Sequence, residues 1–247
     1  MENELTRHAR KFLFTSGKGG VGKSTLAATF ARLLADQNTK VLVIDFDMAL
    51  RTQDIMLGLS SQVVYDWGDV MDGRCRPLTA IVSDSFNGPE LLAAPLKQRV
   101  VTREQARDLV NQYVSYYDYI IMDSPAGVGA GFLASAWAAD YAFVIATPDP
   151  VAVHSAEVAS GLLEEEGIET RLIINRFRKR MVENGMALNI DEVIDTVGAR
   201  LIGVVPEDLQ LAVASQKGRN VDLRRKSAKA MGRILRRMKG EHVPLKI

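Results

Sequence analysis

The sequence predicts an α/β fold, in which a mostly parallel, twisted sheet is flanked by helices on both faces. Short apolar runs alternate with amphipathic stretches along the whole 247-residue chain, as in parallel strands joined by crossover helices. A glycine-rich loop also lies directly between the first apolar run and the first amphipathic stretch, in the order strand, loop, helix. No repeat or low-complexity linker divides the pattern, so we expect one domain over residues 1–247, with residues 1–10 flexible.

Apolar runs of strand length and longer amphipathic segments give the expected elements in order. Strands are expected at residues 12–15, 40–45, 91–94, 119–123, 141–147, 171–175 and 201–205. Helices are expected at residues 24–35, 104–116, 151–165, 190–197 and 223–238.

Composition and charge exclude several classes of protein. The formal net charge of +1 excludes a globally basic nucleic-acid binder, although a local basic patch stays open. Cys75 is the sole cysteine, so one chain can form neither a disulfide framework nor a cysteine-held zinc or iron–sulfur site, and a reducing cytoplasm fits. The first residues carry no apolar signal region, and no apolar run reaches about 18 residues, so we expect neither secretion nor membrane spanning.

The loop has the spacing G-x-x-x-x-G-K-S, which is typical of a site for a nucleotide triphosphate. Glycines let backbone N–H groups converge on phosphate oxygens, Lys23 supplies a positive charge, and Ser24 can place its hydroxyl on Mg²⁺. Lys18 is an additional lysine, and chemistry alone leaves it equally a solvated loop side chain. The loop consists of Gly17, Lys18, Gly19, Gly20, Val21, Gly22, Lys23, Ser24 and Thr25.

Acidic residues follow two of the expected strands, where an open parallel sheet places its ligand crevice. Asp45 and Asp47 come after residues 41–44, and Asp123 comes after residues 119–122. Carboxylates at such positions suit Mg²⁺, directly or through water, and Asp123 is the first choice. The alternative for any one of them is a helix cap or a turn residue.

The segment after Asp123 reads Ser-Pro-Ala-Gly-Val-Gly over residues 124–129. Its composition is flexible, as a loop that senses the γ-phosphate needs to be. A tight connection between two elements is the alternative interpretation.

Together, the loop with Lys18, residues 43–51 and residues 123–127 resemble the deviant Walker A ATPases of the P-loop NTPase class, specifically their MinD branch. Residues 63–66, 203–208 and 214–218 resemble further segments of that branch in the same order, so the resemblance extends from about residue 11 to about residue 240. It implies a slow, partner-stimulated ATP hydrolase that uses ATP/ADP and Mg²⁺. It also implies an ATP-dependent homodimer, in which Lys18 reaches the phosphates of the partner subunit.

The resemblance also implies a role for individual residues at the site. Lys23 and the loop amides hold phosphates, while Lys18 and Lys23 face charge on the transferred phosphoryl group. The metal set is Ser24, Asp47 and Asp123, in which Asp47 helps to place the attacking water and Asp123 acts through water. Asn175 resembles the position that hydrogen-bonds adenine, with a turn residue as the alternative, and Pro206 with Asp208 lies in the second segment that contacts the base.

Two departures from the family pattern stand out. The family commonly reads G-L-R-N-L-D where residues 49–54 read A-L-R-T-Q-D, which puts the response to an activating partner in question. MinD proteins typically end in an amphipathic membrane helix, and residues 240–247 are too short and contain a proline, so we expect it to be absent from this chain. The segment 223–238 is expected to pack an apolar face that includes Leu223 and to expose a basic face.

These features support a leading function and several alternatives. The leading one is a spatial switch in placement of the division site, cytoplasmic and with peripheral contact at the inner face of the cell membrane, acting with MinC- or MinE-like regulatory proteins. A ParA-like DNA-partition ATPase, a flagellar or pilus positioning ATPase and a nonenzymatic nucleotide-gated scaffold are the alternatives. The iron–sulfur branches need cysteine pairs and the tyrosine-kinase branch a tyrosine-rich tail, and this chain has neither.

Overall fold

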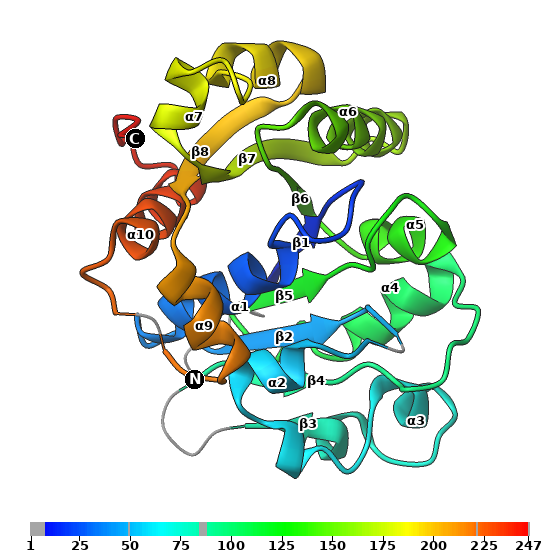
Figure 1. Cartoon of the computed structure of the whole chain (residues 1–247). Helices are drawn as coiled ribbons and strands as arrows, with labels where there is room; N and C mark the ends of the chain where they lie inside the picture. Colours follow the sequence, from blue (N-terminus) through cyan, green and yellow to red (C-terminus); the bar gives the residue numbers. More distant parts are fainter. Residues whose placement is uncertain (1–7, 49, 84–87, 221, 247) are drawn as a thin grey trace.

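One sheet organises the computed structural model, which describes residues 8–48, 50–83, 88–220 and 222–246 (Figure 1). Its strand order is β3-β4-β2-β5-β1-β6-β7-β8, and every neighbouring pair is parallel except β3 and β4. The expected mostly parallel α/β sheet is therefore confirmed. The strands are β1 (Arg10–Thr15), β2 (Val41–Asp45), β3 (Ile81–Val82), β4 (Glu90–Leu92), β5 (Tyr119–Asp123), β6 (Tyr141–Ala146), β7 (Glu169–Phe177) and β8 (Arg200–Pro206).

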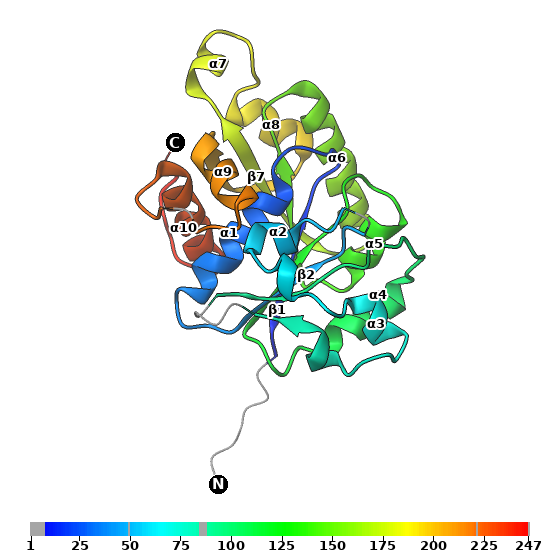
Figure 2. The ribbon, with the colours of Figure 1, turned by 60° about the horizontal axis from the view of Figure 1, so that its bottom comes forward.

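Helices cover both faces of this sheet (Figures 1 and 2). Successive strand residues point to opposite faces, so Leu13 and Phe12 of β1 belong to two different apolar cores. The core with Leu13 contains residues of α3, α4, α5, α6 and α8, and the core with Phe12 contains residues of α1, α2, α9 and α10. The helices are α1 (Lys23–Ala35), α2 (Gln53–Leu57), α3 (Trp67–Met71), α4 (Arg103–Asn111), α5 (Ala130–Trp137), α6 (Pro150–Glu165), α7 (Lys179–Glu183), α8 (Ile190–Val197), α9 (Leu209–Gln216) and α10 (Lys226–Met238), with 3₁₀ turns at Ser60–Gln62 and Pro77–Ala80.

Most expected elements are present with bounds that differ by a few residues, but two helix ends were wrong. The helix expected over residues 104–116 ends at Asn111. The last helix begins at Lys226 and not at residue 223, because the Asp222 carboxylate accepts a hydrogen bond from the backbone N–H of Arg224 and forms a turn there. Leu223 is consequently 52% exposed and is not part of the apolar face of α10.

Two further expectations concern the flexibility of the first ten residues and membrane spanning. Residues 1–7 of the expected flexible segment lie outside the described residues; Ala9 is buried, and Arg10 begins β1. Among the described residues, no helix combines the length and the apolar character that crossing a membrane requires.

An aromatic cluster fixes α1 against the centre of the sheet. The ring of Phe30 in α1 lies 5.3 Å from that of Phe14 in β1 and 5.7 Å from that of Phe143 in β6. Phe14 and Phe143 are themselves 5.0 Å apart, and all three side chains are fully buried. Aromatic pairs at these separations add stability beyond their buried area. The first turn of α1 is thus held rigidly beside the carboxyl ends of β1, β2 and β5.

The contact between β8 and α10 gives a pair of opposite stability predictions. A Cβ on Gly203 of β8 would lie 2.3 Å from Cγ1 of the buried Ile234, so Gly203→Ala should lower the free energy of unfolding by about 1–3 kcal/mol through overpacking. Gly232 lies inside α10 and has nothing within 4 Å of the added Cβ, so Gly232→Ala should raise that energy by about 0.5–1 kcal/mol. Urea unfolding measures both variants; destabilisation by Gly232→Ala or tolerance of Gly203→Ala would contradict this packing.

Candidate functional site

The glycine-rich loop lies at the carboxyl end of β1 and leads into α1. Its first glycine is required by packing, since a Cβ on Gly17 would lie 1.8 Å from the backbone oxygen of Ser155 in α6. Gly22 is required for two reasons: its φ of 93° is left-handed, and a Cβ there would lie 2.4 Å from Nδ2 of Asn175. The loop is therefore held between α6 and β7, with its backbone close to both.

Asn175 of β7 connects the sheet to this loop. Its side chain is buried, and Nδ2 donates a hydrogen bond of 2.8 Å to the backbone oxygen of Val21. Asn175 also lines a cavity of about 180 Å³ in which three of the residues expected at the base meet the phosphate loop. The lining residues are Gly22, Thr25, Asn175, Arg176, Pro206, Glu207, Asp208, Leu209, Leu211 and Ala212.

The carboxylate of Asp208 joins the start of α9 to the start of α10. It accepts from the backbone N–H of Gln210 at the start of α9, and from the guanidinium of Arg225 at 2.6 and 2.7 Å. Ser227 of α10 donates a further bond of 2.7 Å. The bonds from Arg225 are the largest cause that lowers the pKa of Asp208, to about 2. Asp208 thus lies beside the cavity, with its oxygens already engaged by protein donors.

A buried ion pair occupies the centre of the site. Nζ of Lys23 lies 2.6 Å from Oδ1 of Asp123, and the two side chains are 6% and 0% exposed. The same ammonium donates to Oγ of Ser24 at 3.2 Å, so a hydroxyl and a carboxylate oxygen already share one cation. This oxygen set fits Mg²⁺, which in nucleotide sites takes one or two protein oxygens together with phosphates and waters.

Two aspartates from the end of β2 lie next to that pair. Burial, followed by repulsion from Asp123, raises the pKa of Asp45 to about 7. Its two oxygens accept from the backbone N–H groups of Asp47 and Gln53, at 2.9 and 3.0 Å. Burial also raises the pKa of Asp47, opposed by the charge of Lys23. Within the described part of the chain the Asp47 carboxylate has no hydrogen-bond partner of its own, so it is available to water.

The structure thus brings the expected metal set of Ser24, Asp47 and Asp123 to one edge of the sheet, around Lys23. Among the described residues, no three His, Cys, Asp or Glu side chains are placed to hold an ion by themselves.

Gln53, the first residue of α2, belongs to the site although its role was missed from the sequence. Its Nε2 donates to Oδ2 of Asp123 at 2.7 Å and to the backbone oxygen of Ser24 at 3.1 Å. The side chain is fully buried, and its Oε1 has no hydrogen-bond partner in the part of the chain that the structure describes. The available signal was the departure T-Q-D at residues 52–54, where a polar residue replaces an apolar one in a known pattern.

Lys18 is partly exposed and pairs with an aspartate that lies beyond the end of β6. Its Nζ lies 3.4 Å from Oδ1 of Asp149, and the two side chains are 43% and 45% exposed. Burial tends to raise the pKa of Asp149, but bonds from Thr147 and Ala152 and the charge of Lys18 outweigh it, so the pKa is lowered. Asp149 was also missed, although it follows β6 as the other acidic residues follow β2 and β5.

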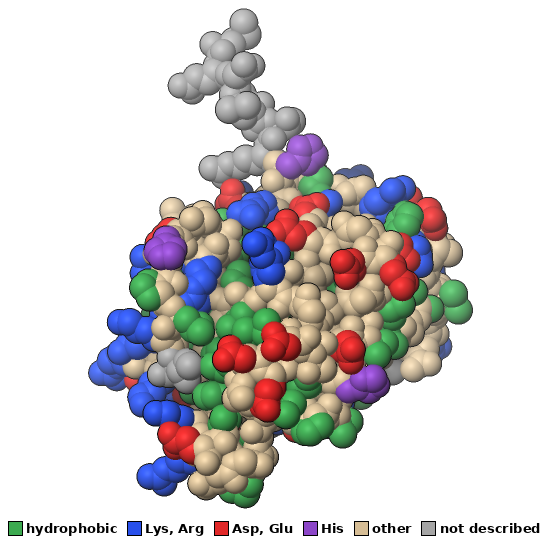
Figure 3. All heavy atoms as spheres, turned by 90° about the horizontal axis from the view of Figure 1, so that it is seen from above, with side chains coloured by type: hydrophobic (Ala, Val, Ile, Leu, Met, Phe, Trp, Pro, Cys, Tyr) green, Lys and Arg blue, Asp and Glu red, His purple; other side chains and the backbone are tan. Residues whose placement is uncertain are grey.

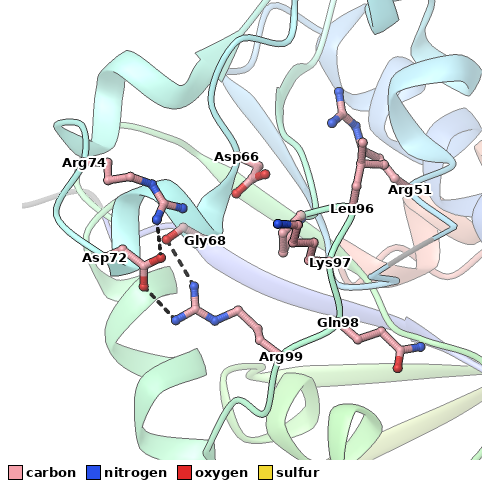
Figure 4. A pocket seen from close by; sticks show the side chains of 10 residues that line it. Arg51, Asp66, Gly68, Asp72, Arg74, Leu96, Lys97, Gln98 and Arg99 are labelled. Carbon is pink, nitrogen blue, oxygen red and sulfur yellow. Dashed lines mark hydrogen bonds and ion pairs between the residues drawn. The ribbon is translucent and has the colours of Figure 1, made fainter.

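A separate cavity of about 780 Å³ lies beside α3, away from the phosphate loop (Figure 4). Arg51 lines it and pairs with Asp54, while Asp72 lies between Arg74 and Arg99, 2.8 Å from each. The bond from Arg99 is the largest cause that lowers the pKa of Asp72. Residues after β2 therefore face two ways, Asp47 and Gln53 towards the loop and Arg51 towards this cavity.

Asp45 gives a pH-dependent prediction. Its folded pKa of about 7 lies above the ordinary 3.8, so folding takes up a proton and stability falls as pH rises between these values. Asp45→Asn removes this titration, so relative to the wild type the variant should gain about 1.4 kcal/mol of stability for each pH unit in that interval. Urea unfolding in EDTA at pH 5 and pH 8 gives the change in the free energy of unfolding of each protein between the two pH values. Comparing the two changes removes any effect of the amide that is the same at both pH values. An identical pH dependence would contradict a raised pKa.

Comparison with known proteins identifies relatives of the whole chain. Residues 12–221 match the family model of the CobQ/CobB/MinD/ParA nucleotide binding domain. The septum site-determining protein MinD of Bacillus subtilis is 37% identical over 95% of this chain and 91% of its own length. In a solved MinC:MinD cell division complex from Aquifex aeolicus, one chain matches with a TM-score of 0.88 at 35% identity, covering 97% of this chain and 99% of that one.

The MinD of Pyrococcus horikoshii, solved with Mg-ADP, shares the fold with a TM-score of 0.84 at 21% identity, covering 93% of this chain and 96% of that one. The family match covers well over half of the chain, and the Bacillus relative aligns along nearly all of it. The chain belongs to the MinD family of cell-division ATPases, within the MinD/ParA class of nucleotide-binding proteins.

Proposed function

We propose that the chain is a Mg²⁺-dependent ATPase that dimerises on ATP and so acts as a spatial switch in placement of the division site. The position of Lys18 carries this proposal. Lys23, Ser24 and Asp123 are gathered at the loop, whereas Lys18 is 43% exposed and reaches only Asp149 at 3.4 Å. A loop lysine with this exposure is available to the phosphates of a second copy.

The contacts of the site support a division of roles. Mg²⁺ would neutralise charge on the phosphates. Ser24 would hold the ion directly, and Asp123 would hold it through water. Lys23 exchanges Asp123 for phosphate oxygens, because the triphosphate offers more negative charge than one carboxylate. Asp47, which is half-buried and without a partner among the described residues, orients the attacking water. Catalysis then consists of positioning and charge stabilisation.

The cavity beside Gly22 is proposed to take the adenine. One amide N–H of Asn175 already donates to the backbone oxygen of Val21, which leaves its other polar atoms for the base. Pro206 lines the same cavity. Asp208 contributes chiefly by fixing α9 and α10 around it, because its oxygens are engaged by Arg225 and Ser227.

The partners belong to the proposal as well. The Aquifex relative was solved as a MinC:MinD complex, which supports a MinC-like partner, and we extend the expectation to MinE-like regulators. We propose a single ATPase domain in the cytoplasm, with peripheral contact at the inner face of the cell membrane. The described strands all belong to one sheet, which supports one domain.

A ParA-like partition ATPase is the second candidate, favoured by the basic face of α10. Ala230, Met231 and Ile234 are buried on one side of this helix, and Lys226 and Lys229 are exposed on the other. Figure 3 shows Lys and Arg side chains gathered along the edge of the molecule where α10 lies. Such a face attracts anionic surfaces, whether lipid headgroups or DNA.

Replacement of Lys18 tests the dimer. With ATP and Mg²⁺, the mass from size-exclusion with light scattering should rise from that of one 27.2 kDa chain towards twice that value, and ADP should leave it unchanged. Lys18→Ala should remove the shift, because the cross-subunit charge is lost, while Lys229→Ala serves as an exposed control. A shift that survives Lys18→Ala, or no shift with ATP, would reject the proposed mechanism.

Nucleic-acid binding separates the two candidates. A division-site switch should not retard a nonspecific DNA duplex, with ATP or with ADP, at about 0.1 M salt. A partition ATPase should retard the duplex with ATP only, lose the effect at high salt, and lose it in Lys226→Glu/Lys229→Glu. The second pattern, observed in a gel retardation assay, would replace the leading proposal by the ParA-like one.

A further inference from the structure

Gln53 makes contacts that the resemblance to a known family does not explain, since the family pattern places leucine at this position. Its backbone N–H donates to Oδ2 of Asp45 at the end of β2. Its side-chain amide donates to Asp123 at the end of β5 and to the backbone of Ser24 in the first turn of α1. One residue therefore joins α2 to three separate elements around the loop.

The carboxylate of Asp123 is shared between two donors of different kinds. Oδ1 receives the ammonium of Lys23 at 2.6 Å, and Oδ2 receives the amide of Gln53 at 2.7 Å. Lys23 also donates to Oγ of Ser24, so Oδ1 and the Ser24 hydroxyl share one ammonium. When a triphosphate takes Lys23, Oδ1 loses its cation, but Oδ2 keeps its amide donor.

Without a donor on Oδ2, the freed carboxylate could turn about its own side-chain bonds. The bond from Gln53 removes that freedom, because its Nε2 is also tied to the backbone of Ser24. Fixing Oδ2 in this way also restricts where Oδ1 can lie. Groups that orient a metal-supporting carboxylate in this way tune the affinity of the site for the metal ion.

The fold alone does not account for an amide here. Gln53 is fully buried, and its Oε1 has no partner among the described residues. An unpartnered buried oxygen is unfavourable relative to an apolar side chain of similar size, such as methionine or leucine. A residue that is unfavourable for packing, and whose donors reach the metal-side carboxylate, indicates a role in the site.

We propose that Gln53 is a positioning residue for Mg²⁺, which holds Asp123 with one oxygen towards Ser24 after Lys23 has moved to the nucleotide. It also connects that carboxylate to α2. This role rests on the Mg²⁺–nucleotide site of the proposed function.

The test compares nucleotide affinity with and without the ion. Binding of a fluorescent ADP analogue is titrated in Mg²⁺ and in EDTA. The dissociation constant in EDTA divided by that in Mg²⁺ reports the contribution of the metal. Gln53→Met keeps the length and the buried position but has no donor, so this ratio should fall about tenfold, while affinity in EDTA stays near that of the wild type. Gln53→Leu, which restores the family residue, should behave in the same way.

Controls separate positioning from damage to the fold. Gln62→Met makes the same change at an exposed residue of the turn Ser60–Gln62 and should keep the wild-type ratio. Thermal unfolding followed by circular dichroism shows whether each variant is folded; if Gln53→Met is not, Gln53→Leu decides. Stimulation of affinity by Mg²⁺ that persists at the wild-type level in the folded variants would overturn the role of Gln53, as would an equal loss in Mg²⁺ and EDTA. No effect of Mg²⁺ on the wild type would instead reject the proposed metal site.

Discussion

The buried contact between Lys23 and Asp123 is the interaction on which the rest of the site depends. The lysine begins α1 and the aspartate ends β5, so the pair joins the loop to the centre of the sheet. A buried charge that loses its partner is strongly unfavourable, by about 3–5 kcal/mol in typical cases. Any ligand that withdraws Lys23 must therefore offer comparable negative charge in return. Phosphate groups meet this condition, and a cation beside Ser24 can compensate Asp123 at the same time. The ion pair thus orders the site and favours ligands that bear phosphate groups.

Packing around this pair prepares the loop for its ligand. Gly17 allows the loop to lie directly against α6, and Asn175 of β7 donates a hydrogen bond to the backbone of Val21. Phe30 fixes α1 on the aromatic cluster beneath it. Little conformational entropy then remains to be lost when the loop closes on phosphate, which favours binding. The segment after β2 is held through the carboxylate of Asp45, which accepts from the backbone N–H groups of Asp47 and Gln53, while Trp67 of α3 donates to the backbone oxygen of Asp45.

The loop and the strand ends could be predicted from the sequence because their signals are local. Glycine spacing defines the loop, and an acidic residue after four apolar ones defines a strand end. Short helices such as α2 and α3 have five residues each, too few for a readable period. The raised pKa of Asp45 was also out of reach, since it depends first on the burial of Asp45 and then on β2 lying beside β5 with Asp45 and Asp123 in register. The amide of Gln53 could not be given a role for the same reason, because Asp123 is 70 residues away along the chain. Leu223 illustrates the opposite error: its spacing fitted the α10 face, but the turn at Asp222 decided the helix start.

The proposed function gives a picture in which one chain holds a nucleotide and the partly exposed Lys18 contacts the phosphates of a second copy. The picture depends on the exchange of Asp123 for phosphate at Lys23, and a crystal structure with Mg²⁺ and a nonhydrolysable ATP analogue would show whether that exchange occurs. We expect Nζ of Lys23 to leave Asp123 and to lie within hydrogen-bonding distance of a phosphate oxygen, while the Gln53 amide remains on Asp123. A nucleotide bound at the loop with the Lys23–Asp123 contact unchanged would refute the exchange.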